Sequence, residues 1–111
     1  MRILLDECVN PRVREAFPQD EVRTVREMGW GGIKNGKLLA LSHGLFDVFL
    51  TLDQNIEYQQ NISRFRFGFL VVKVPDNKIS SYLPLFSAMA DAAQKLRAGE
   101  IVRISHPDCE R

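Results

Sequence analysis

Five short runs of apolar and β-branched residues recur along the chain, at residues 3–5, 21–25, 47–53, 67–74 and 100–104. Runs of this length and composition are typical of β-strands. The run EVRTV at 21–25 alternates polar and apolar residues, which predicts a strand covered on one face. The runs at 3–5 and 67–74 are nearly all apolar, which predicts strands covered on both faces.

Helical patterns are predicted between these runs. An Asn-Pro pair at residues 10–11 can open a brief helix that closes before Pro18. Residues 37–44 combine leucines with a terminal glycine that suits a helix end, and residues 55–68 begin with a polar helix. Over residues 79–97, apolar side chains recur at spacings of three and four, which predicts one amphipathic helix.

Strands that alternate with helices, several of them apolar on both faces, predict an α/β fold. The expected architecture is a three-layer α/β/α sandwich with a mainly parallel central sheet. The chain has 111 residues and contains no repeat or linker, so one domain spanning 1–111 is expected. In such sheets, ligands bind beyond the carboxyl ends of the strands, so side chains that follow a strand are the first candidates for a functional site.

The composition excludes few functions. Apolar residues make up 45% and charged residues 26%, and the net charge of +1 does not indicate a polyanion or a membrane as partner. Cys8 and Cys109 lie far apart and lack the spacing of a zinc site. No apolar run approaches the ~18 residues of a membrane span. These features favour a cytoplasmic protein with reduced thiols and no membrane contact.

Acidic residues follow two of the predicted strands. Asp6 and Glu7 follow the first, Asp53 ends the third, and Asn35 lies in the loop and helix start after the second. If these strands are neighbours, Asp6, Asp53 and Asn35 converge on one cleft, where oxygen ligands suit Mg²⁺ or Mn²⁺. Such an ion activates water and neutralises charge on a phosphodiester, so hydrolysis of RNA or DNA is the natural reaction class. Alternatively, an acid after a strand caps the next helix or solvates a loop.

Three segments carry a family resemblance: ILLDE at residues 3–7, EVRTVREMGWGGIKNGKLLALS at 21–42 and DVFLTLDQNIEYQQN at 47–61. Together they resemble the short PIN-like domain family, relatives of the VapC-type toxins that are paired with small antitoxin proteins. The resemblance implies a compact α/β/α domain with a parallel sheet. PIN domains at large are metal-dependent ribonucleases that act through an acidic cluster, and their relatives are often homodimers.

The resemblance can be carried over position by position. Asp6 matches the first acid of the PIN-like pattern and Asp53 matches the acid of the TLD motif, so these two would hold the ion, while Glu7 would lend charge or accept a proton. Asn35 and Asn55 stand where many relatives have Asp. An amide can bind a metal through its carbonyl oxygen but brings no charge, so Asn35 and Asn55 would fill weaker ligand or water-positioning sites.

Two functions follow from this pattern. The first is a Mg²⁺-assisted endoribonuclease. The resemblance implies that such an enzyme is the toxin component of a toxin-antitoxin module. The second is a catalytically degenerate PIN-like module that binds RNA or a partner protein without cleavage.

A candidate nucleic-acid contact follows Asp53. An aromatic and amide-rich stretch is followed by a basic interval, with no acid between Glu57 and Asp76. Such side chains can hydrogen-bond or stack on unpaired bases and bind phosphates. The alternative is a polar helix followed by a solvated turn. The candidate residues are Tyr58, Gln59, Gln60, Arg64 and Arg66, together with Lys34 and Lys37 on either side of Asn35.

Overall fold

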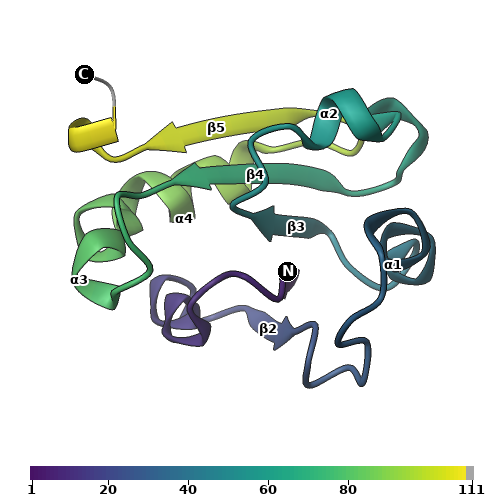
Figure 1. Ribbon diagram of the computed structural model, residues 1–111, viewed down its shortest axis with the longest axis horizontal. Helices are drawn as coiled ribbons and strands as arrows, with labels where there is room; N and C mark the ends of the chain where they lie inside the picture. The colour runs from purple at the N-terminus through teal and green to yellow at the C-terminus, as the bar shows by residue number, and fades with distance from the viewer. Residues whose placement is uncertain (110–111) are drawn as a thin grey trace.

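Residues 1–109 are described by the computed structural model, and they form a five-stranded sheet in which every pairing is parallel. The strand order is β2-β1-β3-β4-β5, and the sheet twists strongly from β5 to β2 (Figure 1). The strands are β1 (Arg2–Leu5), β2 (Glu21–Thr24), β3 (Val48–Thr51), β4 (Gly68–Lys73) and β5 (Ile101–Ser105). The predicted α/β class and parallel sheet are confirmed.

Helices cover both faces of this sheet. One face carries the 3-10 helix η1 (Pro11–Ala16), α3 (Ile79–Tyr82), the 3-10 helix η3 (Leu83–Leu85) and α4 (Phe86–Lys95). The other carries α1 (Asn35–Ser42), α2 (Ile56–Gln59) and the 3-10 helix η2 (Ile62–Arg64), while the short 3-10 helix η4 (Pro107–Cys109) follows β5. The layers are therefore α/β/α. Within residues 1–109, no helix has the length and hydrophobicity needed to span a membrane.

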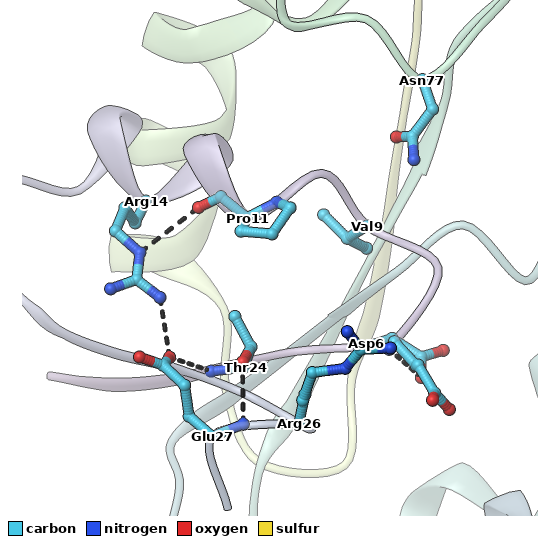
Figure 2. A pocket seen from close by; sticks show the side chains of 9 residues that line it. Asp6, Val9, Pro11, Arg14, Thr24, Arg26, Glu27 and Asn77 are labelled. Carbon is cyan, nitrogen blue, oxygen red and sulfur yellow. Dashed lines mark hydrogen bonds and ion pairs between the residues drawn. The ribbon is translucent and has the colours of Figure 1, made fainter. Parts of the chain in front are cut away.

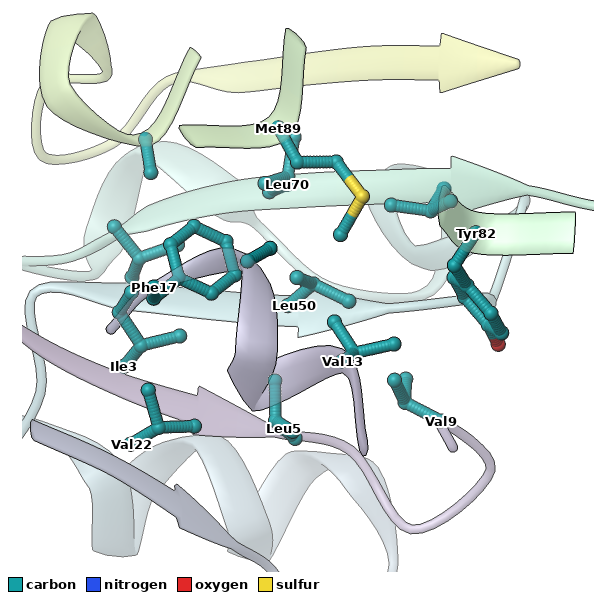
Figure 3. Packing of buried hydrophobic residues seen from close by; sticks show 14 of the residues in the cluster. Ile3, Leu5, Val9, Val13, Phe17, Val22, Leu50, Leu70, Tyr82 and Met89 are labelled. Atoms are coloured by element: carbon teal, nitrogen blue, oxygen red, sulfur yellow. The ribbon is translucent and has the colours of Figure 1, made fainter. Parts of the chain in front are cut away.

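Strand periodicity divides the core into two apolar clusters. Ile3 and Leu5 of β1 face the layer of η1, α3 and α4, whereas Leu4 between them faces the layer of α1. Figure 3 shows the first cluster, where Phe17 and Met89 cover the strands. The strands β1, β3 and β4 are buried on both faces, so side chains can reach the surface only at the ends of these strands.

The prediction of a single helix over 79–97 is wrong. The segment is broken into α3, η3 and α4, and α4 ends at Lys95. Pro84 has no N–H to donate to the carbonyl of Ser80, and its ring crowds that carbonyl, so the chain makes a tighter 3-10 turn over 83–85 before the α-helix resumes.

The brief helix predicted between residues 10–11 and Pro18 is present as a 3-10 helix. Two other boundaries differ from those predicted. The helix predicted at 37–44 begins at Asn35, whose side-chain amide donates to Asp53 and holds the first turn against the end of β3. The third strand ends at Thr51 because the backbone N–H of Asp53 donates to the Thr51 hydroxyl (3.0 Å) in place of a neighbouring strand.

Candidate functional site

The carboxyl ends of β1 and β3 lie side by side. Leu5 pairs with Leu50, and the backbone N–H of Asp6 donates to the Leu50 carbonyl (2.9 Å), so Asp6 is the first residue beyond the paired strand. Asp53 lies two residues beyond the end of β3. The structure thus places both acids at the same edge of the sheet, on adjacent strands.

Thr51, the last residue of β3, connects these two acids. Its hydroxyl donates to Oδ2 of Asp6 (2.7 Å) and accepts from the backbone N–H of Asp53 (3.0 Å), and the residue is fully buried. The other Asp6 oxygen, Oδ1, accepts from the backbone N–H of Glu7 (2.8 Å). Because each of its oxygens has a donor, the Asp6 carboxylate is fixed in orientation.

The Asp53 carboxylate is held by two asparagines. Oδ2 accepts from the side-chain amide of Asn35 (3.3 Å), and Oδ1 accepts from the backbone N–H of Asn55 (3.0 Å). Asn35 therefore presents its NH₂ group to the carboxylate, and an NH₂ group donates but cannot ligate a cation. The structure brings Asn35, Asp53 and Asn55 together as predicted, with Asn55 contributing its backbone rather than its side chain.

The Glu7 side chain lies against the loop that follows β2. Its carboxylate accepts from the backbone N–H of Gly32 (3.1 Å). Gly32 has φ of +79°, a left-handed conformation that favours glycine, and a Cβ on Gly31 would lie 3.4 Å from a Glu7 oxygen. Glu7 thus anchors the glycine-rich loop to the end of β1.

The acids at this edge lack cationic partners. Within residues 1–109, none of Asp6, Glu7 and Asp53 forms an ion pair, whereas eight of the other carboxylates in that range do. Their partners are hydroxyl, amide and backbone groups, which carry no charge. In the part of the chain that the structure describes, no ion pair neutralises these three acids.

Cys8 adds a thiol beside Asp6. Its Sγ lies 3.8 Å from Oδ2 of Asp6, within reach of a weak hydrogen bond. Partial burial of the sulfur, followed by the charge of Asp6, raises the pKa of the Cys8 thiol above its ordinary value. Cys8 therefore stays protonated at neutral pH and does not add a thiolate to the site.

A cavity of about 480 Å³ opens beside Asp6, between the loop that follows β1 and the turn that follows β2. Figure 2 shows the Arg26 side chain extending toward Asp6 along this cavity. On its far side, Arg14 donates to Glu27 (2.7 Å), and Glu27 in turn accepts from the backbone N–H of Thr24 (2.8 Å). The cavity therefore has acids at one end and arginines along its wall.

The predicted nucleic-acid residues are divided between two places. Gln60 lies against the first turn of α1, since a Cβ on Gly36 would be 3.8 Å from its Nε2. Lys34 and Lys37 are exposed on the same turn, beside Asn35, and Tyr58 is 81% exposed. Gln59 is exposed at the end of α2. These residues lie near the acidic edge and are accessible.

Arg64 and Arg66 are not brought to that edge. A Cβ on Gly99, in the turn before β5, would lie 3.4 Å from Ser63, and Gly99 donates to the Phe67 carbonyl (3.0 Å). Residues 63–67 therefore lie at the amino ends of β4 and β5. The segment 58–66 crosses from one edge of the sheet to the other and does not form one surface around Asp53.

Three residues of this region were not predicted. Thr51 was counted only as part of an apolar strand, although it is the one polar residue in the run VFLTL. Arg26 directly follows the predicted strand 21–25, so the same rule that selected Asp6 would have selected it. Arg14 reaches the cavity from η1, and no spacing in the sequence indicates that contact.

No group of three or more His, Cys, Asp and Glu side chains in residues 1–109 is arranged as a ready metal centre. The oxygen ligands that the edge offers are the carboxylates of Asp6 and Asp53, while Asn35 and Asn55 present N–H groups to Asp53. This set suits Mg²⁺, which usually takes one or two carboxylates and keeps several waters, better than zinc, whose sites are built mainly from His and Cys.

Comparison with known proteins identifies no relative: no protein-family model, no curated protein and no solved structure matches the chain.

Proposed function

We propose that this chain is a PIN-like endoribonuclease that depends on Mg²⁺ or Mn²⁺ and holds the ion with Asp6 and Asp53. The supporting observation is the Thr51 bridge, in which one hydroxyl group bonds both to the Asp6 carboxylate and to the backbone of Asp53. Two acids without cationic partners are thereby fixed at neighbouring strand ends. A cation would relieve the unfavourable free energy of holding both carboxylates ionised there.

When bound, the ion would activate a water molecule and neutralise charge on the phosphodiester. The chain's own groups would position the rest. Thr51 and the Glu7 backbone hold the Asp6 oxygens, and the exposed Lys34 and Lys37 on the first turn of α1 would bind RNA phosphates beside Asp53. RNA would therefore lie across the ends of β1 and β3.

One contact favours a second candidate, a catalytically degenerate module that binds RNA or a partner protein without cleaving it. The Asn35 NH₂ group occupies the Asp53 oxygen Oδ2, which a metal ion would otherwise use. The amide has to rotate before its carbonyl oxygen can face the ion. The energy of this rotation opposes metal binding.

The two candidates are separated by cleavage of mixed single-stranded RNA in Mg²⁺. Asp6→Asn keeps the size of the side chain and can still accept the Thr51 hydrogen bond, but it removes the charge. We expect Asp6→Asn and Asp53→Asn each to lower the cleavage rate about 100-fold or more, and EDTA to have the same effect.

Asp91→Asn, purified in parallel, is the matched control. Asp91 is exposed on α4 and paired with Lys95, remote from the acidic edge, so its loss should leave the rate unchanged. Equal cleavage by all variants identifies a contaminating nuclease and refutes the proposal. Binding of RNA with no cleavage by any of them supports the degenerate module.

A further inference from the structure

We propose that the cavity beside Asp6 binds a single nucleotide, with its phosphate group on Arg26 and its base against Pro11 and Val9. Only the choice of a nucleotide as ligand rests on the proposed function. The volume of about 480 Å³ lies within the range of about 300–1,000 Å³ that is usual for small-molecule sites.

The wall formed by η1 and the turn after β2 is held by an internal network. The Arg14 guanidinium donates to Glu27 (2.7 Å) and to the Pro11 carbonyl (3.3 Å). Glu27 and Thr24 exchange two hydrogen bonds, each between a side-chain oxygen and a backbone N–H. Because these groups satisfy one another, this wall is formed before any ligand arrives.

The opposite wall is held by Asn77, in the loop after β4. Its side-chain amide donates to the Cys8 carbonyl (3.0 Å), and its Oδ1 accepts from the backbone N–H of Asn10 (3.2 Å). Tyr82 also hydrogen-bonds to the Asn77 side chain. The loop that carries Val9 and Pro11 is therefore fixed to α3 as well as to β1.

Arg26 supplies a cation that the fold does not use. Within residues 1–109 its guanidinium forms neither an ion pair nor a side-chain hydrogen bond, in contrast to Arg14 in the same cavity. Arg26 is exposed, and its side chain extends along the cavity toward Asp6 (Figure 2). A guanidinium with all its donors available can bind a phosphate group through two hydrogen bonds.

The distribution of charge sets the orientation of the ligand. Arg14 is paired with Glu27, so within residues 1–109 Arg26 is the arginine of this cavity without a carboxylate partner, and a phosphate group would bind at its guanidinium, next to Asp6 (Figure 2). The Pro11 ring and Val9 offer apolar surface on which a base or ribose can pack. An anion with a flat, partly apolar group attached fits this arrangement better than a bare anion.

The test is a titration of the isotope-labelled full chain with uridine 5′-monophosphate in Mg²⁺ buffer, followed by amide chemical shifts. We expect saturable shifts at Val9, Thr24 and Glu27, and an affinity about tenfold lower in Arg26→Gln. Arg23→Gln is the control, because Arg23 lies on β2, pairs with Glu21 and does not line the cavity. That variant should bind as the wild type does.

Three results would overturn the inference: no saturable shifts, equal affinity in Arg26→Gln and wild type, or inorganic phosphate binding as tightly as the nucleotide. The outcome is separable from that of the nuclease test. Nucleotide binding that depends on Arg26, without RNA cleavage, rejects the nuclease and retains the nucleotide site. RNA cleavage by the wild type, together with no saturable nucleotide shifts in the wild type, rejects the nucleotide site alone.

Discussion

Carboxylates at the amino ends of the strands (the amino edge) and at their carboxyl ends (the carboxyl edge) have different bonding partners. At the amino edge, Asp47 accepts from the backbone N–H of Arg2 (2.7 Å) and pairs with its guanidinium (3.3 Å), and Asp20 pairs with the N-terminal amino group (3.4 Å). At the carboxyl edge, Asp6 and Asp53 meet only uncharged donors. The carboxylates of the amino edge are paired with cationic groups, whereas Asp6 and Asp53 are held by uncharged donors.

The two edges also differ in how closely their residues pack. At the amino edge, Leu96 and the Arg97 carbonyl approach Gly68 so closely that no side chain fits there. At the carboxyl edge, the end of β1 borders a cavity of about 480 Å³. The comparison teaches that the close packing at Gly68 and the open cavity at Asp6 lie at opposite ends of the strands.

The largest effect on stability is expected from Gly68→Ala. A Cβ at Gly68 would lie 2.4 Å from Leu96 Cγ and 3.0 Å from the Arg97 carbonyl oxygen, so the substitution should cost about 1–3 kcal/mol of unfolding free energy. Urea denaturation measures this. Gly36→Ala at the carboxyl edge is the matched change: its Cβ meets nothing closer than 3.8 Å in a helix, and it should stabilise by about 0.5–1 kcal/mol. Equal effects at both positions would contradict the difference in packing.

Thr51→Val should cost about 1.5 kcal/mol, because it leaves an Asp6 carboxylate oxygen and the partly buried Asp53 N–H without their partner. It should also lower the affinity for Mn²⁺, measured by calorimetry, since Asp6 loses its fixed orientation. Thr51→Ser keeps the hydroxyl and loses only a methyl group, so it should retain the ion affinity. If Thr51→Val binds Mn²⁺ as the wild type does, the bridge serves stability alone.

Asn35→Asp replaces a hydrogen-bond donor to Asp53 with a second carboxylate. In EDTA the variant should be less stable than wild type by about 1 kcal/mol, because two like charges then face each other. Mg²⁺ should restore the loss, so thermal unfolding should respond more to Mg²⁺ in the variant than in the wild type. Asn61→Asp, which makes the same charge change farther along the segment, should show no such response. Equal responses in the two variants would argue against an ion at Asp53.

The smallest effect is expected from Asp47→Asn. Burial alone would raise the pKa of Asp47, but hydrogen bonds from the Arg2 backbone and guanidinium outweigh it and lower the pKa. The pKa of Asp47 is lower in the folded state than in the unfolded state. The contribution of ionised Asp47 to the unfolding free energy is therefore complete above about pH 4, and it disappears as the pH falls through the folded-state pKa. Both side chains are 46% exposed, so screening limits it to about 0.5 kcal/mol.

The check on this pair is the pH dependence of urea unfolding between about pH 2 and pH 7. Asp47→Asn should lower stability at neutral pH and converge with wild type in acid. Asp6→Asn should change the neutral-pH stability little, because it loses no cationic partner, and relief of the repulsion between Asp6 and Asp53 offsets the loss of the hydrogen bond from the Glu7 N–H. If Asp6→Asn lost more unfolding free energy than Asp47→Asn, the charged residues of the carboxyl edge would stabilise the fold more than those of the amino edge, contrary to this comparison.

The sheet was predictable because burial on both faces leaves continuous apolar runs such as residues 67–74, which no amphipathic helix would show. The position of Asp6 beside Asp53 followed from the same rule, since parallel strands end at one edge. The break at Pro84 was also visible in the sequence, but the apolar spacing across 79–97 outweighed it in the prediction.

Other features depend on contacts between distant segments. Thr51 bonds across β1 and β3 over a separation of 45 residues, and Asn77 holds Cys8 over 69 residues. Arg64 and Arg66 are close to Asp53 along the chain but cross to the other edge, because α2 and η2 carry the chain back to the start of β4. Proximity in sequence is therefore a poor guide wherever a crossover intervenes.

The anchoring of the glycine-rich loop by Glu7 gives the protein a built-in optical reporter. Trp30 is the sole tryptophan of the chain, it lies two residues before the Gly32 N–H that Glu7 binds, and its indole packs edge-on against Phe46 at 6.3 Å between ring centres. A ligand that draws Glu7 away from Gly32 changes the surroundings of that indole. If a ligand moves Glu7 in this way, the emission spectrum of Trp30 would report its binding at the end of β1 without any attached label.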